Sequence, residues 1–162
     1  MNLFAPDSEN IPAGFDTQDF KIRPLTINDV VKDYDAVMSC VGHLSRVFSP
    51  DDTWPTADLT LEQDLIDLGW HQKEFQNKSS FAYTLMSLDD ETCLGCIYVY
   101  PCRKVGYDAC VYLWVRQSLK DKLDEKLYSG VQEWMQQDWW FSKVAYPGRQ
   151  QSWEDWMVLP SK

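Results

Sequence analysis

The sequence lacks several features that whole classes of protein require. No run of residues approaches the ~20 apolar residues that cross a membrane, and the acidic N-terminal stretch has no basic region of the kind that opens a secretory signal. Basic residues are scarce, since 15 lysines and arginines face 25 aspartates and glutamates, for a formal net charge of −10. Nucleic acids and anionic membranes both need clustered lysine and arginine, so we expect neither as a partner. We predict a cytoplasmic protein.

Disulfides and a metal site are not expected either. Five cysteines, an odd number in a chain without a secretion signal, predict free thiols. The one close pair, Cys93 and Cys96, would point to opposite faces of an extended strand and could share a metal only if the strand breaks there. No second Cys-x-x-Cys follows, and the two histidines, His43 and His71, are not spaced as ligands. A metal or redox site on Cys93, Cys96 and Cys102 is an alternative that elemental analysis would decide.

The residues that are present indicate one packed domain. The chain has 162 residues, of which 44% are hydrophobic and 14% aromatic, enough for a single sizeable core. Residues 1–19 are polar and carry two prolines, so we expect an N-terminal arm without a regular element, followed by a single domain over residues 20–162. The excess of acid suits a cationic substrate such as an amine or a basic peptide, or it serves only solubility.

In the first half of the chain, an alternation of apolar and basic residues over 20–25 predicts a half-buried strand. Thr26 and Asp29 form a capping box that opens a helix, and Thr60 and Gln63 form a second. The apolar residues expected on the buried faces are Val30, Tyr34, Val37, Met38 and Val41 in the first helix and Leu61, Leu65 and Leu68 in the second.

In the second half, a hairpin is expected over Asp89–Glu91, and a long helix runs to about Trp139. Trp153 and Trp156, three residues apart, predict a short helix or turn that docks its rings on the domain. The order β-α-α-β-β-β-α-β predicts an α/β domain with a mixed, largely antiparallel sheet flanked by helices. The four strands expected here are residues 81–88, 92–100, 108–115 and 141–146.

The strand over 108–115 leads directly into the long helix, whose free N–H groups and partial positive charge favour a bound phosphate. Together with the segment Ile22–Asp29, this order resembles the GNAT superfamily of acyl-CoA-dependent N-acyltransferases over roughly residues 20–146. The resemblance implies that the pantetheine arm of acetyl-CoA lies in a V-shaped opening between the strands 108–115 and 141–146. The pyrophosphate would then lie on residues 116–123.

The family's glycine-rich R/Q-x-x-G-x-G/A loop is missing, because residues 116–123 contain no glycine. Side chains stand where bare backbone usually wraps the anion. Arg116, Lys120 and Lys122 favour an anion there, whereas Ser118–Asp121 is itself a candidate capping box that favours an ordinary capped helix. Both interpretations stay open. The cofactor-binding residues that the resemblance implies are Trp114, Val115, Arg116, Gln117, Ser118, Lys120 and Lys122.

The family's catalytic groups have only approximate counterparts. A glutamate on the strand 108–115 often serves as general base, but Ala109 or Cys110 takes its place here, and Asp108 is the nearest carboxylate. Tyr112 shares the strand face of Asp108. A tyrosine commonly protonates the departing thiolate, and Tyr146 is the closest match. The implied catalytic residues are therefore Asp108, Tyr112 and Tyr146.

Two functions follow from the resemblance. The first is an N-acetyltransferase that moves an acetyl group from acetyl-CoA to the amine of a small molecule or a peptide, by direct attack. Trp54 and Trp70, near loops that would border the acceptor cleft, are candidates to line its substrate pocket, with simple packing as the alternative. The second is a GNAT-fold binding or scaffold protein that has lost acetyl-CoA binding and catalysis, which the missing glycine loop favours.

Overall fold

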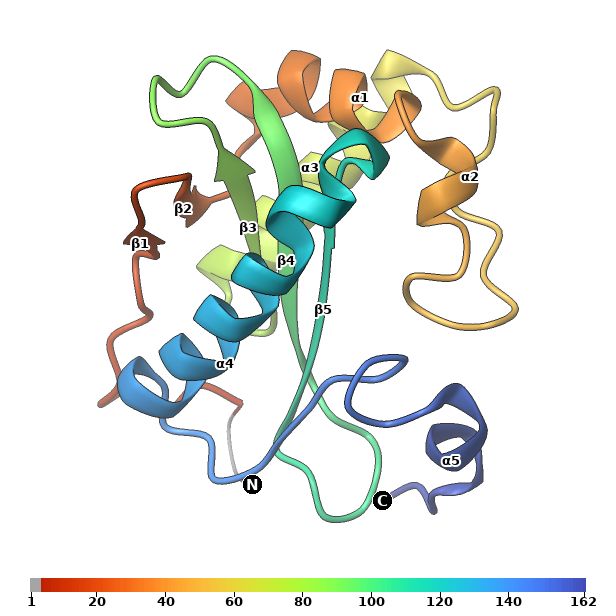
Figure 1. Cartoon of the computed structure of the whole chain (residues 1–162). Helices are drawn as coiled ribbons and strands as arrows, with labels where there is room; N and C mark the ends of the chain where they lie inside the picture. The colour runs from red at the N-terminus through yellow and green to blue at the C-terminus, as the bar shows by residue number, and fades with distance from the viewer. Residues whose placement is uncertain (1–3) are drawn as a thin grey trace.

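The computed structural model describes residues 4–162 and contains one six-stranded sheet. Its strands are β1 (Phe15–Asp16), β2 (Lys21–Pro24), β3 (Phe81–Met86), β4 (Cys93–Pro101), β5 (Ala109–Val115) and β6 (Val144–Ala145). The strands lie in sequential order, antiparallel from β1 to β5, and β6 runs parallel to β5 (Figure 1). The mixed, largely antiparallel sheet predicted from the sequence is confirmed.

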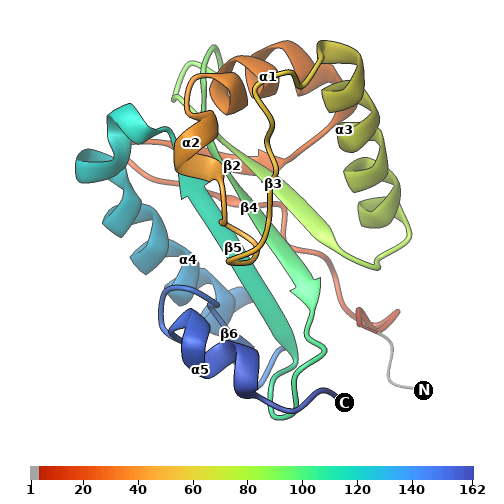
Figure 2. The same ribbon diagram turned by 90° about the vertical axis from the view of Figure 1, so that its right-hand side faces the viewer.

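Helices cover both faces of this sheet. They are η1 (Ile27–Asp29), α1 (Val30–Met38), α2 (Val41–Leu44), α3 (Leu61–Gln76), η2 (Gln117–Leu119), η3 (Lys120–Asp124), α4 (Glu125–Asp138) and α5 (Trp153–Val158). Leu127 and Val131 of α4 pack against one face, and Val37 of α1 and Leu68 of α3 pack against the other (Figure 2). No helix among residues 4–162 is both long and apolar enough to span a bilayer.

The predicted helix starts are confirmed. The Thr26 N–H donates to Asp29 Oδ2 at 2.9 Å, and the Gln63 N–H donates to Thr60 Oγ1 at 3.2 Å. The hairpin turn after β3 also forms where it was expected, with the left-handed backbone of Asp90 (φ 61°) in the turn. These signals are local, so the sequence alone carries them.

The buried faces of α1 and α3 differ from the prediction, because each helix turns a carboxylate inward. Leu61 and Leu65 are exposed, whereas Asp64 is buried beside Leu68. In α1 the predicted Val37 is buried, but so is Asp33. The sheet lies under the stripe of α3 that contains Asp64 and Leu68, whereas Leu61 and Leu65 face solvent. The consequence is a pair of acidic groups inside the molecule.

The predicted orientation of Cys93 and Cys96 is wrong. Leu85 pairs with Gly95 and the next residue of β3 pairs with Cys93, so Leu94 is an extra residue and β4 contains a β-bulge. The extra residue brings Cys93 and Cys96 to the same face of the sheet. Gly95 is needed here, since a Cβ atom would lie 2.0 Å from the carbonyl oxygen of Trp114. All five cysteines are free, as predicted.

The segment after β5 is helical, but its predicted capping box does not form. The first turn begins at Gln117, one residue before Ser118, and Arg116 in the capping position makes no side-chain cap. A short π-helix, η3, follows before α4 begins. β5 and β6 are adjacent and parallel, as predicted, although β6 has only two residues because the Ser142 and Lys143 N–H groups donate to Asp108 instead of to the sheet.

The chain ends pack on this domain. We expected no regular element in the arm, but β1 pairs with β2, and the Phe4 ring stacks on Phe81 and Phe141. Residues 1–3 of the predicted arm lie outside the described part. At the other end, the predicted short helix forms as α5, where Trp156 is buried and Trp153 half-buried.

Candidate functional site

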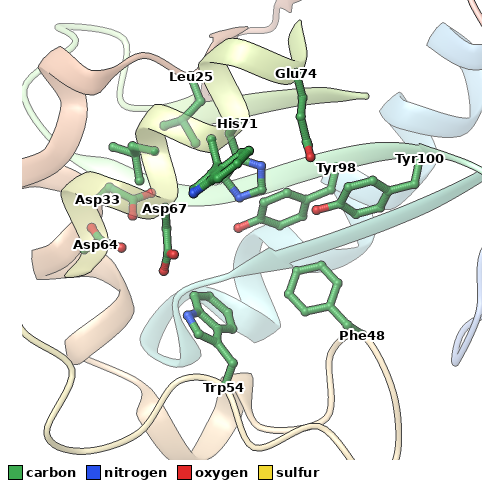
Figure 3. A pocket seen from close by; sticks show the side chains of 12 residues that line it. Leu25, Asp33, Phe48, Trp54, Asp64, Asp67, His71, Glu74, Tyr98 and Tyr100 are labelled. Carbon is green, nitrogen blue, oxygen red and sulfur yellow. The ribbon is translucent and has the colours of Figure 1, made fainter. Parts of the chain in front are cut away.

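One pocket, which we name the acidic pocket, lies between α3, β4 and the loop over residues 48–54 and has a volume of about 350 Å³ (Figure 3). Leu25 and Leu68 also line it, and among its lining residues the only basic side chain is His71. Trp54 and Trp70, the candidates to line a substrate pocket, both line the acidic pocket. The carboxyl and aromatic residues that line it are Asp33, Asp64, Asp67, Glu74, Phe48, Trp54, Trp70, Tyr98 and Tyr100.

Two carboxyl groups meet at one end of the acidic pocket. Asp33 and Asp64 are 4% and 1% exposed and lie side by side in Figure 3. Burial raises the pKa of the Asp64 carboxyl, and the charge of Asp33 raises it further. Burial likewise raises the pKa of Asp33. The Asp64 Oδ2 atom has no hydrogen-bond donor among the described residues. An ammonium group would supply both the missing donor and the missing charge.

The only basic residue of the acidic pocket, His71, adds no positive charge at neutral pH. Burial lowers the pKa of its imidazole below the ordinary value, although Glu74 and Asp67 oppose that shift. Burial also raises the pKa of Asp67. The His71 ring lies 5.4 Å from the ring of Tyr98, and in the sequence of α3 His71 lies between Asp67 and Glu74. The pocket is therefore a place for a cation with apolar parts.

Behind the acidic pocket, Asp33 also contacts the cysteine pair. The Cys96 thiol donates to Asp33 Oδ1 at 3.4 Å, and the Cys93 thiol donates to the Gly95 carbonyl at 3.4 Å. One ligand atom each from Asp33, Cys93 and Cys96 lies within 4.8 Å of the others. No fourth acidic, histidine or cysteine ligand joins them within residues 4–162, whereas structural zinc sites take four. Cys102, the third cysteine of the metal alternative, lies in a different cluster.

A second pocket, which we name the basic pocket, lies at the opening between β5 and the segment after β6, with a volume of about 270 Å³. Four basic side chains face one acidic side chain, although the whole protein has a net charge of −10. Such a local excess of positive charge suits an anion. The charged residues that line it are His43, Arg46, Lys120, Arg149 and Asp124.

Arg149 joins the two sides of this opening. Its guanidinium donates to both carboxylate oxygens of Asp124, at 2.8 and 2.9 Å, and to the Leu113 carbonyl at 3.3 Å. The Arg149 partner lowers the pKa of the Asp124 carboxyl. Leu113 belongs to β5. Its carbonyl, at the edge of this strand, can therefore accept a hydrogen bond from a donor that lies in the opening.

The predicted phosphate residues separate in the structure. Lys120 lines the basic pocket. Arg116 instead donates to the Cys93 carbonyl at 2.7 Å and to Asp35 at 2.7 Å, which ties the end of β5 to β4 and α1. Lys122 is exposed and does not line the basic pocket. Gln117 and the next residue, Ser118, lie in the first helical turn after β5.

The predicted catalytic residues do not come together. Asp108 lies before β5, roughly 26 Å along the strand from Arg116, and its carboxylate accepts two backbone N–H groups. Tyr112 packs against Phe48 on the α1 and α3 face. Tyr146 belongs to the cluster under α4, on the opposite face. Burial raises the pKa of both tyrosines, so their hydroxyls stay protonated.

One buried contact separates the two pockets. The indole N–H of Trp114, which lines the basic pocket, donates to the hydroxyl of Tyr98, which lines the acidic pocket, at 3.1 Å. Trp114, predicted as a cofactor contact, therefore lies between the two. Val115, the next residue, is buried under α4. An anion in one pocket and a cation in the other would approach each other across this pair.

The comparisons with known proteins bear on the fold. The sequence matches no protein-family model and no curated protein. Among solved structures, the ribosomal-protein-S5-alanine acetyltransferase of Vibrio fischeri superposes with a TM-score of 0.61 at 13% identity, over 76% of this chain and 67% of that one. RimL, a ribosomal L7/L12 α-N-protein acetyltransferase in complex with coenzyme A, gives 0.59 at 14% identity, over 80% and 70%.

A third similar structure is the microcin C7 self-immunity acetyltransferase MccE in complex with acetyl-CoA and AMP, with a TM-score of 0.56 at 11% identity, over 79% of this chain and 69% of that one. These likenesses agree with the sheet order and with the helix after β5. The chain has the GNAT fold. Within the GNAT fold, the basic pocket lies at the opening that the sequence resemblance assigned to the cofactor.

Sequence reasoning missed most of both pockets. A signal for the acidic pocket was present, because residues 64, 67, 71 and 74 follow a helical spacing on α3 and form a polar stripe. The leucines of the same helix predicted a different buried face. The basic pocket had no such signal, since His43, Arg46 and Arg149 come from segments far apart in the sequence.

Proposed function

We propose that this chain transfers an acetyl group from acetyl-CoA to an amine that is a cation in water. The observation that carries the proposal is the pair of buried carboxyl groups, Asp33 and Asp64, in a pocket that Tyr98 and Trp114 separate from a basic opening. Similar structures hold coenzyme A or acetyl-CoA. Carboxyl groups suit the amine, and basic groups suit the phosphates of the cofactor.

The basic pocket fits the cofactor by its charge and by its place. His43, Arg46 and Lys120 would hold the phosphates through side-chain charge, in place of the backbone of a glycine loop. Gln117 and Ser118, at the first helical turn, stay predicted contacts. When bound, acetyl-CoA supplies a thioester carbon that an amine nitrogen can attack. Arg149 must release the Leu113 carbonyl if that carbonyl is to accept from the pantetheine arm.

Asp64 is the base that the geometry favours. Asp64 lines the pocket, its Oδ2 atom has no donor among the described residues, and its raised pKa suits it to take a proton from an ammonium group near neutral pH. The amine nitrogen forms its bond to the acetyl carbon while the C–S bond breaks. Of the two protons that the ammonium loses, one leaves through the carboxyl pair to solvent and one ends on sulfur. Tyr112 and Tyr146 stay protonated donors for that second transfer, and Asp108 stays a predicted alternative base.

A second function, a binding protein that no longer holds acetyl-CoA, is favoured by one observation. The guanidinium of Arg149 occupies the opening between β5 and the segment after β6, paired with Asp124. A stable pair there would keep the pantetheine arm out, and the missing glycine loop agrees with such a loss.

Thermal unfolding with acetyl-CoA separates the two functions. Acetyl-CoA at ~100 times its dissociation constant is expected to stabilise the fold by ~2.7 kcal/mol. Mixing the protein with acetyl-CoA and a panel of aliphatic amines and peptides should then release the coenzyme A thiol and add one acetyl group to the acceptor, seen by mass spectrometry. If millimolar acetyl-CoA in low salt causes no thermal shift, the transferase function is refuted and the binding-protein function is favoured.

A further inference from the structure

The acids of the acidic pocket form two separate centres rather than one. Asp64, Asp67 and Glu74 all lie on one stripe of α3, and Asp67 and Glu74 are seven residues apart, ~10 Å along the helix axis. Figure 3 shows Asp33, Asp64 and Asp67 gathered at one end of the pocket and Glu74 at the other, beside Tyr100.

The first centre has an unmet need for a cationic donor. Asp64 is 1% exposed, and its Oδ2 atom has no hydrogen-bond partner within the described residues, although it lines the pocket. The group beside it, Asp33, is another carboxyl, which hydrogen-bonds to Asp64 through a shared proton but supplies no positive charge. A buried polar atom in this state is rare in proteins. An ammonium group placed there would donate to Asp64 and compensate the negative charge of the pair.

The space between the centres is aromatic. The rings of Tyr98 and Tyr100 are parallel, with centroids 6.2 Å apart, and Phe48 packs edge-on against both. Trp54 packs against Phe48 from the loop side. His71 lies on the other side and is neutral at pH 7, because burial lowers the pKa of its imidazole. An apolar chain would fit along these rings, and a cation would find only acids at the two ends.

We propose that the acceptor is a linear aliphatic diamine or polyamine, with one ammonium among Asp33, Asp64 and Asp67 and a second at Glu74. This inference rests on the proposed function only in taking the diamine as the amine that is acetylated. About eight single bonds of ~1.5 Å in a zigzag chain cover ~10 Å, the separation along α3 of Asp67 and Glu74, the nearest acids of the two centres. A diamine of seven methylenes or spermidine has this length, and a monoamine leaves one centre without a partner.

Calorimetric titration of the full chain without cofactor tests the inference. The series is 1,3-diaminopropane, putrescine, 1,7-diaminoheptane and spermidine, with heptylamine as the monoamine of matched length. We expect 1,7-diaminoheptane and spermidine to bind at least tenfold more tightly than heptylamine, and the shortest diamine to lose this advantage. Equal affinity for heptylamine and 1,7-diaminoheptane would overturn the proposal, and this comparison needs no variant.

Substitutions then assign the second centre. Glu74→Gln should remove the advantage of the diamine and leave the affinity for heptylamine unchanged. Glu62→Gln, an exposed acid on the same helix and outside the pocket, is the matched control and should keep the advantage. If Glu74→Gln weakens both ligands equally, the assignment to Glu74 is wrong.

Rates distinguish a failure of this inference from a failure of the proposed function. Selective diamine binding without acetyl transfer to any amine would refute the proposed transferase function and support the diamine site. Acetyl transfer to heptylamine with the same kcat/KM as to 1,7-diaminoheptane would support the transferase function and refute the diamine site. Preferred acetylation of the long diamines supports both.

Discussion

The acidic pocket and the basic pocket lie on either side of one buried contact and carry opposite charges. Asp33 and Asp64 mark the first, and Lys120 and Arg149 mark the second. The Tyr98 hydroxyl and the Trp114 indole form the contact between them. In a chain of net charge −10, the basic pocket is a local exception that the average charge does not predict.

The two pockets also differ in how their charges are satisfied. In the basic pocket Arg149 and Asp124 form a two-bonded ion pair, so part of the positive charge is already compensated. In the acidic pocket the Oδ2 atom of Asp64 has no donor among the described residues, and the neighbouring Asp33 is another acid. The difference teaches that the acidic pocket needs its ligand more than the basic pocket does. The four predictions below test this difference, from the largest expected effect to the smallest.

The largest effect is expected at the base. Asp64→Asn removes the group that takes the proton from the ammonium and leaves the side-chain shape nearly unchanged. We expect kcat/KM for the preferred amine to fall about 100-fold, the usual size of a general-base contribution. Initial rates measure this loss, and Glu62→Gln is the control on the same helix. A variant as fast as the parent would exclude Asp64 as the base.

The same substitution is expected to stabilise the protein at high pH when no ligand is added. Burial and Asp33 raise the pKa of Asp64 from 3.8 to about 8, so the folded state holds a proton that the unfolded chain releases between these values. The stability that this proton contributes is present below pH ~4 and is lost as pH rises through the folded pKa. Asp64→Asn should therefore be more stable than the parent at pH 9 by on the order of 2 kcal/mol.

Urea unfolding at pH 4.5 and pH 9 measures this second effect. Asp67 and His71, which face Asp64, stay in both proteins and largely cancel in the difference, whereas Asp33 titrates together with Asp64 and is part of the measured change. The gain in stability should shrink at pH 4.5. An equal difference at the two pH values would show that the carboxyl pair does not titrate as the structure indicates.

In the basic pocket a smaller loss is expected. Lys120→Ala removes one of the charges at the opening and should weaken acetyl-CoA binding about tenfold in low salt, or ~1.4 kcal/mol. Raised salt should shrink the effect, since side-chain charge near the surface is screened. Lys122→Ala is the matched control, because Lys122 lies outside the pocket. Equal effects of the two substitutions would contradict this account of the phosphate site.

The smallest effect is expected from the acid of the basic pocket. Asp124→Asn releases Arg149 from its ion pair and removes the only acidic side chain that lines the pocket. The affinity for acetyl-CoA should rise about threefold, while the fold loses ~1 kcal/mol from the partly exposed pair. Titration and thermal unfolding of the same variant measure both. A weaker affinity would show that the Asp124–Arg149 pair belongs to the bound state.

The sequence predicted the fold more fully than the site. Alternation and helical spacing placed β2 to β5, α3 and α4, and the hydrogen bonds of Thr26 and Thr60 fixed two helix starts. For the site, Lys120 lines the basic pocket and the two tryptophans Trp54 and Trp70 line the acidic pocket, while their roles stay predictions. Arg116 has the predicted place in the chain but binds Asp35, because α1 brings a carboxylate that no local pattern contains.

What the sequence determined by itself is therefore local: periods of two and 3.6, caps, turns and the free state of five thiols. What only the tertiary structure decided is the direction of single side chains. One extra residue at Leu94 turned Cys93 to the face of Cys96, and packing buried Asp64 rather than Leu65. Each of these outcomes depends on contacts between residues distant in the chain, and the summed packing of the core outweighs the local cost of burying one carboxyl group.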